Sequence, residues 1–153
     1  MKQTLIRFFA LAAGIFALDQ SIKHRIEQMR PEQFPKKAGN IPVTLHRSHN
    51  RGLFMNMLEN RPNSAAVLSS AALGMFSVFY LPSLRNKCSA FYMTGAALIM
   101  GGALSNVCDR FSKGYVVDYF SLPVKPIRHV IFNIGDFSIF TGLSALLWDQ
   151  LSS

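Results

Sequence analysis

The feature that most constrains this chain is a set of four long apolar segments separated by charged connections. The segments cover residues 4–22, 64–84, 88–107 and 134–151. Each approaches the length of about 20 residues that a helix needs to cross a 30 Å hydrocarbon core, although the first and fourth have the shorter apolar runs. Lipid offers backbone groups no hydrogen-bond partner, so spanning segments are expected to be helices. The sequence therefore predicts an all-α integral membrane protein with four transmembrane helices, folded as one domain over residues 1–153.

The first segment also has the start of a secretory signal peptide, because Lys2 and Arg7 precede or interrupt its apolar run. A cleavage site of small residues is missing, since the apolar run ends directly in Leu18 and Asp19. We therefore expect a retained span. The third segment is rich in small residues, including Gly95, which favour close helix packing. We expect this segment at the centre of the bundle.

Two polar connections join the spans, and four spans place both of them on one side of the membrane. The long connection, residues 23–63, alternates apolar and polar residues at Ile41, Val43 and Leu45, which predicts a short amphipathic strand. The second connection, residues 109–133, contains Gly114 and two prolines, and we expect it to be irregular.

The formal charge of +8 is compatible with a nucleic-acid binder or a membrane protein. The basic residues occupy loops between apolar segments rather than one helix face, which favours anionic lipid headgroups and argues against nucleic acid as the partner. Twelve of the 16 basic residues lie in or beside the two polar connections. The positive-inside rule would place these connections in the cytoplasm, but the first is long, so charge alone leaves the orientation open.

Cysteine and histidine give no sign of a metal site. Cys88 and Cys108 would lie about 30 Å apart along one helix, too far for a disulfide. No CxxC or HExxH pattern occurs, and the four histidines are scattered. We expect neither a metal nor a cofactor.

Four aspartates are the candidates for chemistry: Asp19, Asp109, Asp118 and Asp136. All lie at or near span ends on one side, where an ionisable group is a functional candidate. A simpler interpretation is helix capping by Asp136 or by its neighbour Asn133. Two carboxyl groups held close together share one proton, and such a pair can hydrolyse a peptide bond by acid–base catalysis. No GxSxG motif offers a serine nucleophile instead.

At these positions the sequence resembles the lipoprotein signal peptidase family over nearly the whole chain. Five segments, in order, resemble the family patterns D-Q-x-x-K, N-x-G, G-G-A-x-G-N-x-x-D-R, V-V-D-F and F-N-x-A-D. They are Asp19-Gln20 with Lys23, Asn50 with Gly52, the stretch from Gly101 to Arg110, Val116-Val117-Asp118-Tyr119, and Phe132-Asn133-Ile134-Gly135-Asp136.

The resemblance implies four transmembrane helices with a small β-element on the extracytoplasmic side of the bacterial plasma membrane. It implies an aspartic endopeptidase that needs no cofactor, and we expect it to be a monomer. Its substrates would be lipid-modified prolipoproteins, cut just before the diacylglyceryl cysteine. The catalytic pair would be Asp118 and Asp136. The residues expected to bind substrate or support the pair are Asn106, Arg110, Asn133, Asn50, Gly52, Asp109, Asp19 and Lys23.

Three departures from the family patterns stand out. Ser105 occupies a position that is usually Gly, and Gly135 one that is usually Ala. Leu53 and Phe54 follow Gly52, where the family usually has two small residues. Their bulk is expected to narrow the lipid-binding groove or, alternatively, only to contact the membrane.

Two other functions remain open at this stage. A degenerate paralogue would bind lipidated peptides without cleaving them. A small proton-coupled transporter subunit would use its intramembrane acids as a relay. The clustering of the acids at one membrane face argues against the transporter.

Overall fold

The computed structural model describes residues 2–53, 57–84 and 89–152, so Phe54 and Cys88 lie outside the described residues. The described residues form four helices, a small sheet and two short 3-10 helices. Their bounds are α1 Lys2–Gln28, η1 Pro31–Gln33, β1 Lys36–Lys37, β2 Thr44–Asn50, α2 Pro62–Ser83, α3 Ala90–Lys113, β3 Val116–Ser121, η3 Ile127–His129 and α4 Ile134–Leu151.

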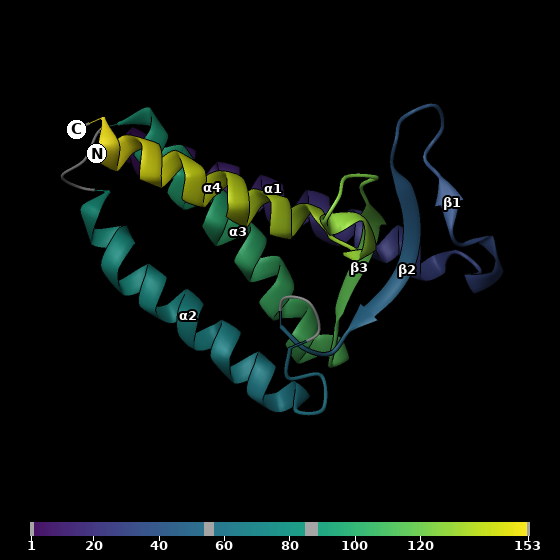
Figure 1. The fold of residues 1–153 in the computed structure, drawn as a ribbon. Helices are drawn as coiled ribbons and strands as arrows, with labels where there is room; N and C mark the ends of the chain where they lie inside the picture. The colour runs from purple at the N-terminus through teal and green to yellow at the C-terminus, as the bar shows by residue number, and fades with distance from the viewer. Residues whose placement is uncertain (1, 54–56, 85–88, 153) are drawn as a thin grey trace.

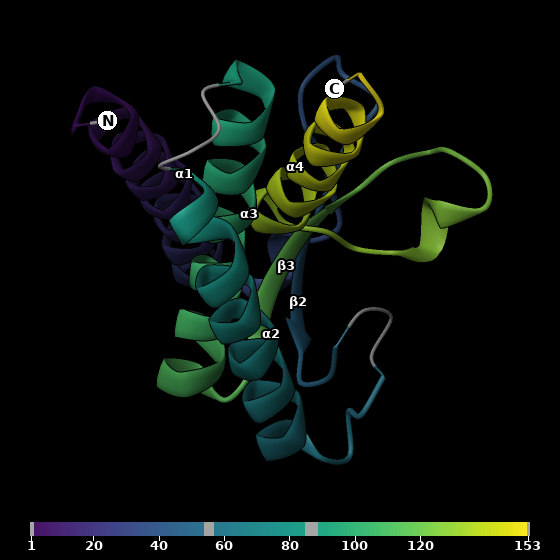
Figure 2. The same cartoon turned by 90° about the vertical axis from the view of Figure 1, so that its left-hand side faces the viewer.

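The helix α3 lies between α1 and α4 and also contacts α2 (Figure 2). Both termini lie at one end of the helices, and the sheet lies at the other end (Figure 1). Glycines allow this packing, as the small residues of the third segment predicted. Gly102 of α3 faces Gly135 of α4 so closely that a Cβ on Gly102 would collide with the Gly135 carbonyl oxygen. Gly95 and Gly142 meet in a similar way along the same pair of helices.

Three helices, α1, α2 and α3, are long and apolar enough to cross a membrane. The fourth, α4, has 18 residues and carries Asp136 in its first turn and Asp149 near its end. Two helix ends differ from the expected boundaries. The helix α1 continues to Gln28, beyond residue 22. The helix α3 continues to Lys113, so Asp109 and Arg110 are helical rather than part of a connection.

The sheet has three antiparallel strands in the order β1-β2-β3. The short strand expected at Ile41, Val43 and Leu45 is present as β2, but it begins only at Thr44, so Leu45 alone of the three lies in it. The expectation that the second connection is irregular was wrong in part, because residues 116–121 form β3. The valines and aromatics of β3 suit a buried strand, but it forms only because β2, far away in sequence, supplies its partner. Gly114, with φ of +79°, ends α3 and turns the chain into this strand.

The added length of α1 ties the sheet to the helices through Glu27. Its Oε1 lies 3.2 Å from Arg47 Nε and 2.8 Å from His49 Nε2, both on β2. Its Oε2 accepts a hydrogen bond of 3.1 Å from the Tyr115 hydroxyl. Glu27 therefore positions β2, which ends at Asn50, relative to the end of α1.

Candidate active site

Asp118 and Asp136 come from different elements and are joined by one asparagine. Asp118 lies on β3, whereas Asp136 lies in the first turn of α4. Asn133 caps α4: its Oδ1 accepts from the Asp136 N–H at 2.9 Å, and its own N–H donates to Asp136 Oδ2 at 3.1 Å. The same side chain donates through Nδ2 to Asp118 Oδ1 at 2.7 Å. The capping interpretation is thus correct, and the cap also connects the two acids.

Two further asparagines each donate to one of the acids. Asn106 of α3 donates through Nδ2 to Asp136 Oδ1 at 2.8 Å. Asn50, at the end of β2, donates to Asp118 Oδ2 at 3.2 Å. Every carboxylate oxygen of the pair therefore accepts an N–H, and each acid has a defined orientation.

The pair lines a small cavity of about 80 Å³. The walls of the cavity include Asn50, Asn106 and Arg110, and also Leu53, the first of the two bulky residues after Gly52. A larger groove of about 340 Å³ adjoins it between α2, α3 and α4, and Asp136, Asn106 and Arg110 line both hollows. Apolar side chains form most of the remaining groove wall: Ala72, Leu73, Phe76, Ile99, Ala103, Val107 and Ile139. An extended apolar molecule lying in the groove would therefore reach the acids.

Arg110 connects the two hollows to the loop after β2. Its Nη2 donates to the Gly52 carbonyl at 2.8 Å, and its Nη1 donates to the Asn106 carbonyl at 3.2 Å. Gly52 in turn donates its N–H to Asn50 Oδ1 at 2.9 Å. Arg110 Nε is buried and has no partner among the residues that the structure describes, so it has one N–H left for a ligand.

The cavity of the Asp118–Asp136 pair is not lined by Asp19, Lys23 or Asp109. All three side chains are fully buried, and Lys23 Nζ lies 2.8 Å from Asp19 Oδ2 and 3.1 Å from Asp109 Oδ2. Asp109 also accepts from the backbone N–H of Val117 at 3.1 Å, which holds the end of α3 against β3. The supporting role expected of the three residues stays a prediction, and these contacts are its structural basis.

Three members of this buried network had no role assigned from the sequence. Gln20 donates to Ser105 and to Asp109. The hydroxyl of Tyr119 donates to Asp19 Oδ1 at 2.9 Å and accepts from the Ile134 N–H. Ser105 contacts both Asp19 and Lys23. All three lie inside the quoted motifs, so the motifs were the available signal, but their contacts depend on how α1, α3 and β3 pack together.

Burial and the neighbouring Asp136 charge raise the pKa of Asp118 to about 7, although hydrogen bonds from Asn133 and Asn50 oppose the rise. Desolvation disfavours the charged form of a carboxyl, and a second carboxylate nearby disfavours it further. Asp118 therefore holds a proton up to neutral pH. Asp136 accepts two N–H donors at the start of α4, from Asn106 and from the Asn133 backbone.

The family model described as signal peptidase (SPase) II matches residues 11–152. Proteins named lipoprotein signal peptidase from Mesorhizobium japonicum and Sinorhizobium fredii are 33% and 32% identical over 92% and 95% of this chain, which covers 83% and 86% of their lengths. The chain belongs to the signal peptidase II family. A solved bacterial membrane enzyme shares its fold, with a TM-score of 0.79 at 20% identity over 95% of this chain and 88% of that one.

Membership in the signal peptidase II family confirms the resemblance and the prediction of a membrane protease that cleaves signal peptides from prolipoproteins. The fold prediction is confirmed at a coarser level, as a mostly helical membrane enzyme fold with a small antiparallel sheet.

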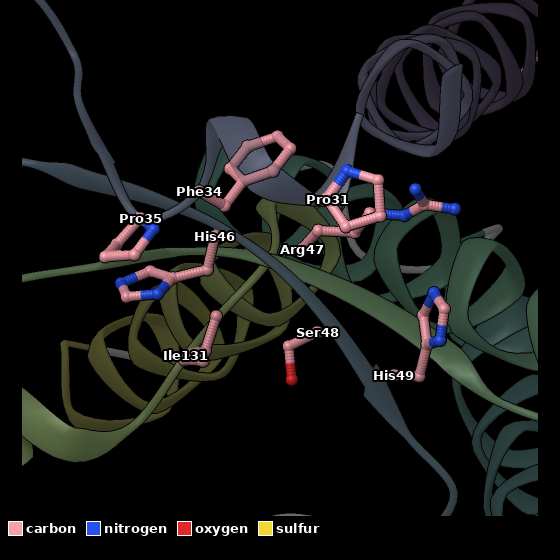
Figure 3. A pocket seen from close by; sticks show the side chains of 8 residues that line it. All are labelled: Pro31, Phe34, Pro35, His46, Arg47, Ser48, His49 and Ile131. Atoms are coloured by element: carbon pink, nitrogen blue, oxygen red, sulfur yellow. The ribbon is translucent and has the colours of Figure 1, made fainter. Parts of the chain in front are cut away.

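This member of the signal peptidase II family also has an open hollow of about 530 Å³ on the outer side of its sheet (Figure 3). Its walls come from η1, the residues after it, β2 and Ile131, and none of the four candidate aspartates lines it. His46 and His49 lie at opposite ends of the labelled side chains, and each has its own partner, Ser121 for His46 and Glu27 for His49. Proteolytic chemistry is therefore better placed at the cavity of the aspartate pair.

The raised pKa of Asp118 predicts that the folded enzyme loses stability as the pH rises. Between about pH 4 and 7 the folded state keeps a proton that the unfolded state, with a pKa near 3.9, has released. Stability is therefore full below about pH 4 and is lost toward pH 7, by at most about 4 kcal/mol. In detergent, the fall in Tm between pH 5 and 8 is expected to be smaller in Asp118→Asn than in wild type. Equal falls in both proteins would contradict the raised pKa.

Proposed function

We propose that this chain is an aspartic endopeptidase that cuts prolipoproteins just before the diacylglyceryl cysteine, with Asp136 as the base and Asp118 as the proton donor. One observation carries the proposal: two buried carboxyl groups, joined by Asn133, line one cavity beside an apolar groove. A peptide carrying acyl chains has the apolar and polar parts that these adjoining hollows would receive.

In the proposed reaction, Asp136 removes a proton from a water molecule as the water oxygen attacks the scissile carbonyl carbon. Asp118 donates its proton to the carbonyl oxygen, which gives a neutral gem-diol. In the second step, the C–N bond breaks, Asp136 returns its proton to the leaving amine, and Asp118 takes a proton back from the gem-diol. One water is consumed, and the pair ends with the single proton with which it began.

Three asparagines and one arginine support this chemistry in distinct ways. Asn133, Asn106 and Asn50 hold the two carboxyl groups through side-chain N–H donors. Arg110 holds Gly52, and its free Nε–H points to a role in binding a substrate carbonyl. Arranging catalytic groups in advance is worth several kcal/mol of the barrier, because the ordering cost is met on folding.

The groove between α2, α3 and α4 is the proposed site of the apolar parts of the substrate. Its lining by Leu73, Phe76 and Ile139 suits acyl chains or the apolar signal segment. Leu53 reaches the aspartate cavity, which supports the expectation that the residues after Gly52 shape the substrate site. Phe54 is outside the described residues.

We further propose that α4 is a fourth span and that the sheet and the aspartate pair face the extracytoplasmic side. The placement of both termini at one end of the helices and the sheet at the other fits an even number of spans (Figure 1). The signal segment of a prolipoprotein would approach from within the bilayer, and its lipid-modified cysteine would lie at the membrane surface near the pair. The basic loops would then meet anionic lipids of the outer leaflet.

The test uses purified protein in detergent with one prolipoprotein in two forms, with and without the diacylglyceryl cysteine. We expect cleavage of the lipidated form and at least a roughly 100-fold lower kcat/KM for the unlipidated form, because the groove contributes binding only to the former. Mass spectrometry locates the cut. Equal cleavage of both forms would contradict the substrate assignment, and tight binding without cleavage would favour a degenerate paralogue.

A further inference from the structure

Ser105 is a fully buried hydroxyl on α3, directly before Asn106, at a position where the family pattern has Gly. It donates to Asp19 Oδ2 at 2.6 Å. Since its only proton is used there, its oxygen accepts from Lys23 Nζ at 3.1 Å and from Gln20 Nε2 at 3.0 Å. Through this hydroxyl, Ser105 on α3 contacts the side chains of three α1 residues, Asp19, Lys23 and Gln20.

Lys23 determines which way the Asn106 amide points. Its ammonium can only donate, and it lies 2.8 Å from Asn106 Oδ1, so the amide oxygen must face Lys23. The amide nitrogen is then turned toward Asp136 Oδ1, to which it donates at 2.8 Å. A flipped amide would present an oxygen to Asp136, a contact that only the protonated acid tolerates. The orientation of Asn106 therefore favours the ionised Asp136 that the base requires.

We propose that Ser105 is a positioning residue whose hydroxyl holds Lys23 and Asp19 in place, an arrangement called the lock below. Lys23 in turn orients the Asn106 amide so that the amide N–H points at Asp136. This inference rests on the proposed function, in which Asp136 is the base. Ser105 does not touch the reacting atoms, and its effect passes through Lys23 and Asn106. The family pattern usually has Gly at this position, and Gly has no hydroxyl to make these contacts.

Gly135, the second departure from the family pattern, lies next to the Asp19 carboxylate that Ser105 contacts. A Cβ added at Gly135 would lie 3.1 Å from Asp19 Oδ2, 2.9 Å from Asn133 Oδ1 and 3.0 Å from the Gly102 carbonyl oxygen. The Ser105 hydroxyl and Lys23 Nζ both hold Asp19 Oδ2 at this place. Without the Ser105 hydroxyl, the carboxylate loses one of these two partners and can move away from an added methyl group, which relieves one of the three close contacts. Ser105 and Gly135 are therefore expected to depend on each other.

The first experiment compares the kinetics of Ser105→Ala with those of wild type on the lipidated prolipoprotein. Because one hydrogen bond contributes about 0.5–1.5 kcal/mol, we expect kcat to fall roughly 3- to 10-fold. KM should stay within about twofold, and the acidic limb of the kcat–pH profile should move to higher pH as Asp136 becomes easier to protonate. The matched control is Ser112→Ala on the same helix, whose exposed hydroxyl donates to the Cys108 carbonyl of its own helix. Identical kcat and pH profiles for Ser105→Ala and Ser112→Ala would overturn the inference.

The second experiment does not depend on catalysis. Thermal unfolding in detergent is measured for Ser105→Gly, Gly135→Ala and the double variant. We expect Gly135→Ala to lower the Tm in the wild-type background and to lower it clearly less in the Ser105→Gly background. Additive changes would overturn the lock on Asp19.

The two experiments separate the inference from the proposed function. If wild type cleaves no lipidated substrate, the proposed function fails and the catalytic part of the inference fails with it. A non-additive Tm cycle would then still uphold the lock itself. If wild type cleaves but Ser105→Ala matches the control, only the positioning role is lost.

Discussion

Replacing either Asp118 or Asp136 with Asn is expected to lower kcat on the lipidated prolipoprotein by a factor of about 10²–10⁴, the range typical of general acid–base groups. Asn cannot accept the proton of the attacking water at position 136 or donate a carboxylic proton at position 118. The two acids act as a unit, so the double variant should be about as inactive as either single variant rather than show the product of both losses.

Folding must be separated from chemistry in this comparison. Each variant is checked by its elution from size exclusion and by its Tm in detergent. The exposed acid Glu59 offers a matched control, since Glu59→Gln makes the same chemical change away from the cavity. Near-normal cleavage by a folded Asp118→Asn or Asp136→Asn variant would show that the assigned pair is wrong.

Replacing Lys23 with Met is expected to destabilise the protein by about 3–5 kcal/mol, because it leaves two buried carboxylates without their shared cation. Neither Asp19 nor Asp109 is exposed to solvent. For a chain of this size, the loss corresponds to a fall in Tm of roughly 6–20 °C.

Lys113 is the natural control for Lys23 because it contacts the same acid. Its Nζ lies 2.8 Å from Asp109 Oδ1, but its side chain is 27% exposed, so its ion pair is partly solvated. Lys113→Met is expected to cost no more than about 1 kcal/mol, since exposed ion pairs contribute little. Thermal unfolding of the two variants in the same detergent distinguishes the cases. Equal Tm losses would contradict the view that burial makes the Lys23 contacts important.

The local patterns of the sequence were sufficient for the helices and for the identity of the acids. Long apolar segments can only be helices in lipid, so segment positions followed from hydropathy alone. The helix ends were less predictable. The turns from residue 23 to Gln28 in α1 and from Asp109 to Lys113 in α3 are polar, and they continue as helix because Glu27 and Asp109 find partners on the sheet.

The strands, unlike the helices, could not be placed from local sequence patterns alone. The alternation at Ile41, Val43 and Leu45 indicated a strand that begins only at Thr44. The valines and aromatics of β3 suit a strand, but they do not identify its partner. Pairing between β2 and β3 joins residues about 70 positions apart in the sequence, for example Ser48 with Asp118. A pattern of one segment carries no information about such a partner.

The candidate site, too, depends partly on residues that the sequence identifies and partly on contacts that only tertiary packing creates. The sequence by itself identified four candidate aspartates, and the resemblance to the family motifs narrowed them to Asp118 and Asp136, an assignment that stays a prediction. The hydrogen bonds of Ser105 and Lys23 and the close surroundings of Gly135 are set by the packing of α1, α3 and α4. Hydrogen bonds act over about 3 Å, and only the folded chain brings groups more than 80 residues apart, such as Asp19 and Ser105, to that distance.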